Sequence, residues 1–433
     1  MGAGGLTWAM WPRKSRFATC PPGRVELIYW EKWTDLEGQA MQNVVDWFNQ
    51  SQSRIWVNKV TIADIAAKAM VAIGGNDPPD VVGLFNYNIP QYAEAAAVIP
   101  IESFKGSEVL GEALYTPALW RLLSHEGKQW GGVSACHSLA FYYNRARFRD
   151  ANIASPPKTI AELDALMDRF TERDAKGGIK STSFCQPIPD WWLFFWPFLF
   201  GGDIYDQVAN RATMDSPECI SAFQWVSDCA ARLGREEGRA FASSFNRSID
   251  SADDPFFNAR VAMIMQGPWI ANFARTYKPS LDFAVAPLPV DAAVYDPAQP
   301  ITMIEADVLM IPKGCPHPEE AFEFLLFTQR REVHERLAAE HFKPSGLRSV
   351  SPEFVSRHPH PFIKVHNDMM QSPRARVQPR TRTWKEYSDL INGAFDAIWK
   401  GDDVGRQLTT VQSRIQSVID DSAARLRQRR GHA

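Results

Sequence analysis

The fold is decided by Val25-Glu-Leu-Ile-Tyr-Trp30 and by two similar runs that follow it, Ile55-Trp-Val-Asn-Lys-Val60 and Asp80-Val-Val-Gly-Leu84. Each run is short, apolar and rich in β-branched or aromatic residues, which is typical of buried strands. Residues 36–50 and 62–73 lie between them and carry apolar side chains at helical spacing. Strands and helices that alternate in this way predict a parallel α/β sheet, in which ligands bind beyond the carboxyl ends of the strands.

A second set of strands and helices begins near Leu139. Thr159 and Glu162 form a capping box, the sequence pattern that starts a helix, and Ser216-Pro217 starts another helix. We expect further strands at 139–143, 260–265, 282–286 and 306–311, and further helices at 318–328 and 404–427.

The charge balance excludes some classes of partner. The 433 residues include 47 lysines and arginines against 50 aspartates and glutamates, a formal net charge of −3. Such a balance gives no general attraction to phosphate backbones, so nucleic acid is not an expected partner. No apolar run reaches the roughly 18 residues of a membrane-spanning helix. The six cysteines show neither a CxxC pair nor zinc spacing, so a disulfide framework is not predicted.

The N-terminus has only some features of an export leader. Residues 5–11 are apolar, but Arg13, Lys14 and Arg16 follow them, whereas in a secretory signal the cations come first. Phe17-Ala-Thr-Cys20 has a limited similarity to a lipoprotein cleavage site. We interpret residues 1–22 as the remnant of a leader or as a disordered tail.

Four parts of the sequence share the pattern of a known family. They are residues 75–82 with 92–102, 141–145 with 151–163, 256–269, and 309–313 with 318–324. The third contains Phe256-Phe-Asn-Ala-Arg-Val-Ala-Met263 and then Gly267-Pro-Trp269. In order and composition these parts resemble extracellular solute-binding proteins of ABC importers, family 1, the maltose-binding type, which bind carbohydrates.

This resemblance implies an α/β fold with two lobes, the type II periplasmic-binding-protein fold. Each lobe is then a sheet flanked by helices, and the ligand cleft lies between the lobes. By analogy, the first lobe comprises residues 23–137 and 287–328, and the second comprises 138–286 and 329–433. Closure is a hinge motion that is stabilised by ligand contacts to both lobes.

The resemblance also implies a function and a place in the cell. The protein would be a monomer that captures a solute and passes it to the membrane permease subunits of an ABC importer. It would act in the periplasm or elsewhere outside the cytoplasm, either free or anchored to the membrane by a lipid.

Aromatic residues beside carboxylates indicate a sugar ligand. Sugars are recognised by aromatic faces together with side chains that exchange hydrogen bonds with hydroxyls. Trp30 and Trp33 flank Glu31 at the end of a strand, and Asp190-Trp-Trp192 follows a proline turn. Trp269 resembles the stacking tryptophan of the family. We therefore expect a carbohydrate of one to three units or a derivative. The predicted ligand-binding residues are Trp30, Glu31, Trp33, Asn86, Tyr87, His137, Asp190, Trp191, Trp192, Gly267, Trp269 and Glu305.

Glu305 departs from the family pattern, which has a pair of glycines at 304–305. We expect its side chain to enter the cleft and accept hydrogen bonds from ligand hydroxyls, because it precedes the apolar strand 308–311 rather than a polar surface segment. For each tryptophan taken singly, packing in the core is the alternative interpretation.

Other functions are weighed against sugar binding. A glycoside hydrolase could draw its two carboxyl groups from Glu31, Asp190 and Glu305, but it needs them at a fixed separation in one site, whereas the lobes would place them on opposite walls. We therefore predict no enzyme. A binder of a non-sugar solute and a partner of a ligand-sensing receptor stay open. His358 and His360 lie among prolines without zinc spacing, so no metal and no cofactor are predicted.

Overall fold

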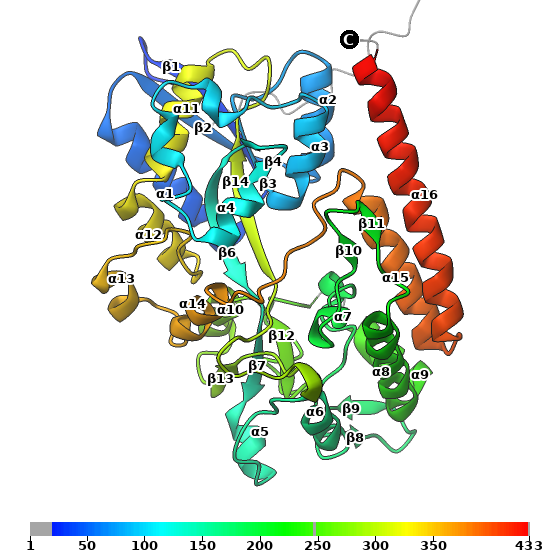
Figure 1. Ribbon diagram of the computed structural model, residues 1–433. Coiled ribbons are helices and arrows are strands. Elements are labelled where there is room, and N and C mark those ends of the chain that lie inside the picture. The colour runs from blue at the N-terminus through cyan, green and yellow to red at the C-terminus, as the bar shows by residue number, and fades with distance from the viewer. Residues whose placement is uncertain (1–19, 246–247, 432–433) are drawn as a thin grey trace, which may run out of the picture.

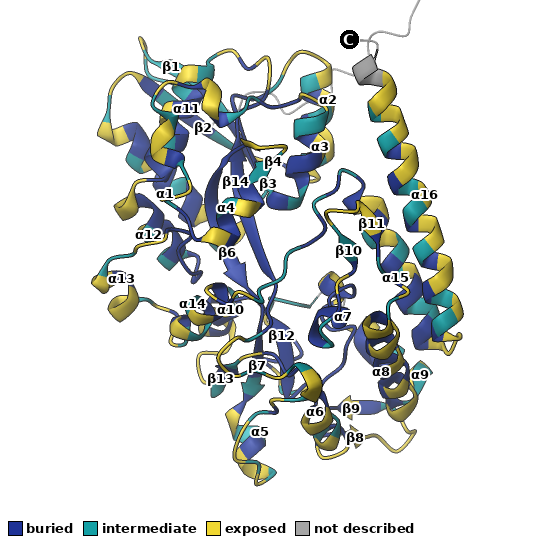
Figure 2. Cartoon of the chain, viewed as in Figure 1, coloured by how far each residue is buried: buried dark blue, intermediate teal, exposed yellow. Residues whose placement is uncertain are grey.

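Two α/β lobes make up the computed structural model, which describes residues 20–245 and 248–431 (Figure 1). The interpretation of residues 1–22 falls almost entirely outside this description, which begins at Cys20. Strands in the interior of both lobes are buried, and the helices around them expose their outer faces (Figure 2).

The first lobe is built on a five-stranded sheet with the order β2-β1-β3-β14-β6. β1 (Val25–Glu31) lies parallel to β2 (Ile55–Thr61) and to β3 (Val81–Phe85), which confirms the prediction of a parallel arrangement. β14 (Ile304–Met310) is antiparallel both to β3 and to β6 (Gly132–Ser138). The carboxyl ends of β1 and β3 therefore meet at one edge of the sheet.

Helices pack against this sheet. α1 (Asp35–Ser51) buries Met41, Val44, Val45 and Phe48, the residues whose spacing predicted the helix. The other elements of this part of the chain are α2 (Ile65–Gly74), α3 (Ile89–Glu94), α4 (Pro117–Leu123), α11 (Pro318–Thr328), the 3-10 turns η2 (Asn86–Asn88), η3 (Ile101–Ser103) and η4 (Ser107–Leu110), and the hairpin of β4 (Ser124–His125) and β5 (Lys128–Gln129).

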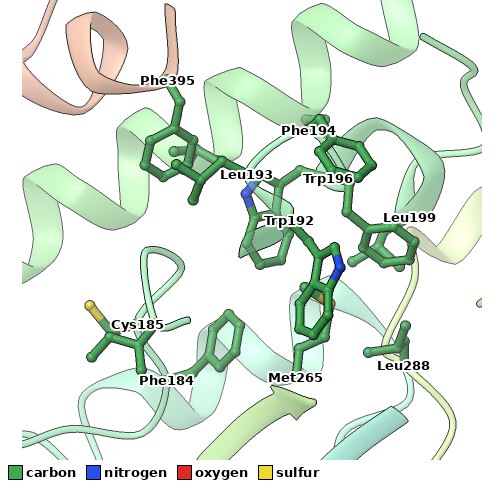
Figure 3. Close-up of a cluster of buried hydrophobic side chains, with 14 of the residues drawn as sticks. Phe184, Cys185, Trp192, Leu193, Phe194, Trp196, Leu199, Met265, Leu288 and Phe395 are labelled. Atoms are coloured by element: carbon green, nitrogen blue, oxygen red, sulfur yellow. The ribbon is translucent and has the colours of Figure 1, made fainter. Parts of the chain in front are cut away.

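The second lobe has a three-stranded antiparallel sheet. β7 (Ala140–Asn144) lies between β12 (Met263–Gln266) and β13 (Phe283–Ala286). Large side chains, among them Trp192 and Trp196, fill the core between sheet and helices (Figure 3). The remaining elements are α5 (Arg145–Asp150), α6 (Ile160–Met167), η5 (Asp190–Trp192), α7 (Trp196–Leu199), α8 (Pro217–Leu233), α9 (Arg235–Ser243), α10 (Ile270–Tyr277), η6 (Ala292–Val294), α15 (Trp384–Lys400), α16 (Val404–Gly431), and the hairpins β8 (Glu172–Arg173) with β9 (Ile179–Ser181) and β10 (Tyr205–Asp206) with β11 (Arg211–Ala212).

Two lobe boundaries differ from those predicted. Leu288 and Val290 belong to the second-lobe core, so the chain returns to the first lobe at Ile304 rather than at residue 287. α12 (Arg331–Glu340) packs against α1 and β6 and places its apolar face in the first-lobe core, so the exit at 329 is too early. The chain then passes through α13 (Pro352–Arg357) and α14 (Ile363–Met370) before it reaches α15.

Three histidines form a chain of hydrogen bonds where β6 passes into β7. The hydroxyl of Tyr142 lies 3.1 Å from His360 Nε2 and 2.8 Å from His366 Nε2. His366 Nδ1 lies 3.1 Å from the carbonyl oxygen of Ser138, the last residue of β6. His358 Nε2 lies 3.1 Å from the carbonyl oxygen of Lys343. The chain of bonds therefore connects the crossing strand with the segment that follows α12.

The partners of these rings fix the positions of their protons. The backbone N–H of His360 donates to His358 Nδ1, and that of Phe362 donates to His360 Nδ1, so the protons of both rings are on Nε2. The ring of His366 carries its proton on Nδ1, because this atom donates to the carbonyl of Ser138. Burial lowers the pKa of His358 to about 4 and that of His366 to about 3, so both rings are neutral near pH 7.

We expect the protein to lose stability as the pH falls from about 6.5 to about 4. An unfolded histidine binds a proton near pH 6.5. Burial lowers the pKa of His334 and His341 to about 4, and it lowers the pKa values of His358, His360 and His366 in the same direction. The unfolded chain therefore binds more protons in this window, and acid favours unfolding. Urea titrations at pH 7, 5.5 and 4.5 measure this decline.

Two buried carboxyls act in the opposite direction. Burial raises the pKa of Asp250 to about 8 and that of Asp254 to about 6, so the folded protein holds protons there that the unfolded chain has lost. They offset part of the histidine effect.

In a His366→Asn variant, which keeps a donor for the carbonyl of Ser138, the decline in the free energy of unfolding as the pH falls should be shallower than in the parent. Equal slopes for parent and variant would contradict the assignment.

Candidate functional site

Side chains from both lobes meet at the carboxyl edge of the first-lobe sheet. The first lobe contributes the residues after β1 and β3, together with Glu305 and Asp307 on β14. The second lobe contributes η5 and the loop between β12 and α10. His137 on β6 is paired with Glu305 across the ladder, so their side chains lie on the same face of the sheet.

Three tryptophans and a histidine form an aromatic group here. The ring of Trp269 lies 6.2 Å from that of Trp192 and 6.5 Å from that of Trp191, measured between centroids. The ring of His137 is perpendicular to that of Trp269 at 4.7 Å. Trp192 is buried, whereas Trp191 is 45% exposed. Trp191 is therefore the most exposed member of this group, and Trp269 is partly exposed.

Trp269 folds back over the loop that precedes it. A Cβ atom on Gly267 would lie 2.0 Å from the Trp269 ring, so the loop needs glycine at this close approach. The indole N–H of Trp269 donates to Asp250 Oδ2 at 2.9 Å, and Asp254 Oδ2 accepts the backbone N–H of Asp250. Burial, and then the carboxyl of Asp254, raises the pKa of Asp250 to about 8. The loop thus holds the ring through a buried carboxyl.

Glu305 connects three elements. Its Oε2 accepts hydrogen bonds from His137 Nε2 and Trp192 Nε1, each at 3.0 Å. Its Oε1 accepts from Gln378 Nε2. Trp192 belongs to the second lobe, and Gln378 lies in the segment between α14 and α15. The side chain of Glu305 is buried, and its carboxylate joins the two lobes.

A buried set of charges lies beside the aromatic group. The Nζ atom of Lys32 is 2.9 Å from Asp307 and 3.5 Å from Glu31, and that of Lys343 is 2.6 Å from Glu37 and 3.8 Å from Asp307. Burial alone would lower the pKa of both lysines, but the carboxylates outweigh it and raise both values. Burial alone would raise the pKa of Asp307, but the two lysines lower it. Lys32, Lys343 and Asp307 are therefore charged.

Lys343 connects the charges with the aromatic group. Its ammonium lies 5.2 Å from the ring centroid of Trp33 and 5.4 Å from that of Trp269, within the range of cation–π contacts. The structure thus brings two lysines, Lys32 and Lys343, to the predicted site. Both are already paired with carboxylates.

Three of the predicted ligand-binding residues have structural partners. Trp30 packs in a hydrophobic cluster of the first lobe, because it alternates with Glu31 across the strand. Glu31 is fully buried and accepts hydrogen bonds from the Tyr29 hydroxyl and from backbone N–H groups. The side-chain oxygen of Asn86 accepts the backbone N–H of Ala306 at 2.8 Å. These contacts hold the sheet edge in place.

The other predicted residues of the first lobe lie nearer to the aromatic group. Trp33 meets the ring of His341 edge-on at 4.4 Å between centroids. Tyr87 is stacked on Phe85 at 5.1 Å, and burial, then the charges of Glu305 and Asp307, raises the pKa of its hydroxyl. In the second lobe, Asp190 is exposed beside Trp191.

Five further residues join this site, and sequence reasoning did not select them: Lys32, Asp250, Asp307, Lys343 and Gln378. Lys343 and Gln378 lie in irregular segments far along the chain, where no strand end marks a cleft. Lys32 stands between two selected residues, and its position at a strand end was a usable signal.

Within residues 20–245 and 248–431, no group of three or more histidine, cysteine, aspartate or glutamate side chains is placed to hold a metal ion. In the same part of the chain, no helix is both long enough and apolar enough to cross a membrane.

Comparison with known proteins supports the resemblance drawn from the sequence. The family described as bacterial extracellular solute-binding protein matches residues 32–333. The maltotriose-binding protein of Pyrococcus abyssi is 23% identical over 333 residues, which are 75% of this chain and 66% of that relative.

Solved structures show the same fold at low identity. CpMnBP1 with mannotriose bound has a TM-score of 0.78 and 22% identity, covering 90% of this chain and 99% of that one. UgpB of Mycobacterium tuberculosis in complex with glycerophosphocholine has a TM-score of 0.75 and 20% identity, covering 93% and 100%. The chain belongs to the bacterial extracellular solute-binding protein family, whose members bind solutes for ABC importers outside the cytoplasm without converting them chemically.

Proposed function

We propose that this protein captures a small carbohydrate, of one to three units or a derivative, between its two lobes and closes over it by hinge motion. The observation that carries the proposal is the group of Trp191, Trp192 and Trp269 beside the carboxylate of Glu305. Indole faces suit the apolar faces of sugar rings, and carboxylate and amide oxygens accept from their hydroxyls.

Unpaired hydrogen-bond acceptors around Glu305 support a ligand rich in hydroxyls. His137 Nδ1 and Gln378 Oε1 are buried and have no partner within the described residues. Gln378 is oriented by Glu305, because its amide nitrogen must face the carboxylate, which leaves its oxygen unpaired. Buried polar atoms without partners are costly, so a solute that donates hydrogen bonds here would stabilise the closed form.

The names of similar proteins offer two classes of solute. The relatives named for maltotriose and mannotriose favour an oligosaccharide, and the UgpB structure with glycerophosphocholine offers a phosphodiester. Lys32 and Lys343 could favour a phosphate, but each is already paired with carboxylates. Glu31, Glu37, Asp307 and Glu305 outnumber the lysines, so an anionic solute would enter a negative site. We therefore favour the sugar.

The closed form would have a partner at the membrane. We propose that it docks on the permease subunits of an ABC importer as a monomer, either in the periplasm or held to the membrane by a lipid. A ligand-sensing receptor is the alternative partner. An ATPase assay with purified permease in nanodiscs distinguishes the permease from a receptor as the partner. If the protein delivers solute to the permease, it should raise the ATPase rate of the permease only when solute is present.

A thermal-shift screen tests the class of solute. A ligand at a hundred times its dissociation constant adds about 2.7 kcal/mol to the stability of the folded state, which is a readily measured rise in melting temperature. We expect this rise with mono- to trisaccharides or their derivatives. If only amino acids, linear polyamines, sn-glycerol 3-phosphate or glycerophosphocholine raised the melting temperature, the carbohydrate assignment would be wrong.

We expect Gly267→Ala to weaken solute binding by about tenfold or more. The added Cβ atom would overlap the ring of Trp269, which must leave its place beside His137 and Trp192. Loss of one well-placed aromatic contact costs roughly 1–2 kcal/mol. Calorimetry with the best sugar from the screen measures the change.

Gly393→Ala is the matched control. Gly393 lies in α15, and a Cβ atom there would meet nothing within 4 Å, so this variant should bind like the parent. Its melting temperature should stay the same or rise slightly, because alanine favours helix. Equal affinity in the Gly267 variant and this control would place Trp269 outside the site.

A further inference from the structure

Glu305 differs from the other buried carboxylates of the site in its partners. Glu31, Glu37 and Asp307 each have a lysine ammonium within 4 Å. Across the described residues, no lysine or arginine forms an ion pair with Glu305, whose donors are the side chains of His137, Trp192 and Gln378. A buried carboxylate without a cation is costly, even when it is hydrogen-bonded.

His137 has an unused nitrogen beside Glu305. Its Nε2 donates to Glu305, and its Nδ1 is buried without a partner among the described residues. With the ring proton on Nε2, the ring offers Nδ1 to the ligand as an acceptor.

The local charges and acceptors are thus complementary to a cation with several N–H donors. The four carboxylates of Glu31, Glu37, Asp307 and Glu305 face three lysines, because the charge of Glu31 also acts on Lys59. The first-lobe wall therefore has an excess of negative charge. The unpaired atoms near Glu305, His137 Nδ1 and Gln378 Oε1, are both acceptors. An ammonium group has three donors and no acceptor, and it forms charge-assisted hydrogen bonds with a carboxylate.

We propose that the solute is an amino sugar whose ammonium group binds at Glu305, with its ring against the tryptophans. This inference rests on the proposed function and narrows it from carbohydrates in general to those that carry a free amine. Glu305 is then the residue that distinguishes an amino sugar from its hydroxyl counterpart. The tryptophans would contact either kind of sugar equally.

Matched sugars test the inference directly. The probes are glucosamine, galactosamine and mannosamine, the β-1,4-linked di- and trisaccharides of glucosamine, the hydroxyl counterparts of all five, and their N-acetyl derivatives. We expect at least one amine to bind about tenfold or more tightly than its hydroxyl counterpart at pH 7, in line with the greater strength of charge-assisted hydrogen bonds. The N-acetyl derivative, which has no charge, should lose this advantage.

The pH dependence gives a second readout that needs no variant. As the pH rises past the pKa of the sugar amine, the affinity for the amino sugar should fall toward that of its hydroxyl counterpart. The titratable groups that face Glu305 are His137, Tyr87 and Asp307, and Asp250 and Lys343 both contact Trp269. Titration of these groups changes the affinity for the hydroxyl sugar as well. The ratio of the two affinities at each pH therefore reports the titration of the sugar amine alone.

Glu305→Gln removes the charge and keeps the shape. The new amide nitrogen can face Gln378, whose own amide can turn over and present its oxygen, so the contacts to His137 and Trp192 are kept. In this variant the preference for the amine should fall to within about threefold, because the affinity for the amine should fall more than the affinity for the hydroxyl sugar. Glu332→Gln, at an exposed acid of α12 that is not part of the site, removes the same charge elsewhere in the first lobe; it is the control and should keep the preference.

The outcomes distinguish a failure of the amino-sugar inference from a failure of the proposed function. If neutral sugars bind at least as tightly as their amines, or if Glu305→Gln keeps the preference, the inference is wrong and sugar capture stands. If Glu332→Gln abolishes the preference as fully as Glu305→Gln does, the preference comes from the overall negative charge of the lobe and not from Glu305, and the inference is wrong. If no sugar of any series binds, the proposed function fails and the inference fails with it.

Discussion

The carboxylate of Glu305 is the contact on which the relation of the two lobes depends. It accepts hydrogen bonds from a crossing strand, from the second lobe and from the segment that precedes α15. A buried carboxylate must keep its donors or return to water. In the hinge motion proposed above, opening of the lobes would expose Glu305 and break its bond to Trp192. The hydrogen bonds of one side chain would then couple closure of the lobes to the chemistry of the site.

Periodicity predicted most of the fold, because each lobe is built from short-range patterns. The strands of the first lobe and α1 follow from alternating and helical spacing within single segments. The lobe boundaries do not follow in this way, since α12 joins the first lobe through contacts between residues far apart in sequence. Amphipathic patterns show that a helix has a buried face, but they do not show which core receives it.

The site was predictable where one segment carries several of its residues. Trp191 and Trp192 were selected beside a proline turn and Trp269 by its resemblance to the stacking tryptophan of the family, and the three rings do lie together. Trp30 shows the limit of this reasoning, because alternation along β1 directs it away from the face of Glu31. Lys343 and Gln378 reach the site from irregular segments, and only the three-dimensional structure brings them there.

The crossover from β6 to β7 and the candidate site differ in how fully their polar side chains are hydrogen-bonded. At the crossover, His358, His360 and His366 are neutral rings whose nitrogen atoms all have partners. In the site, two buried acceptors beside Glu305, His137 Nδ1 and Gln378 Oε1, have no partner among the described residues. A solute therefore has nothing to add at the crossover, whereas a donor-rich solute would give partners to the acceptors beside Glu305. In the hinge motion proposed above, the free energy that favours closure would come from these contacts.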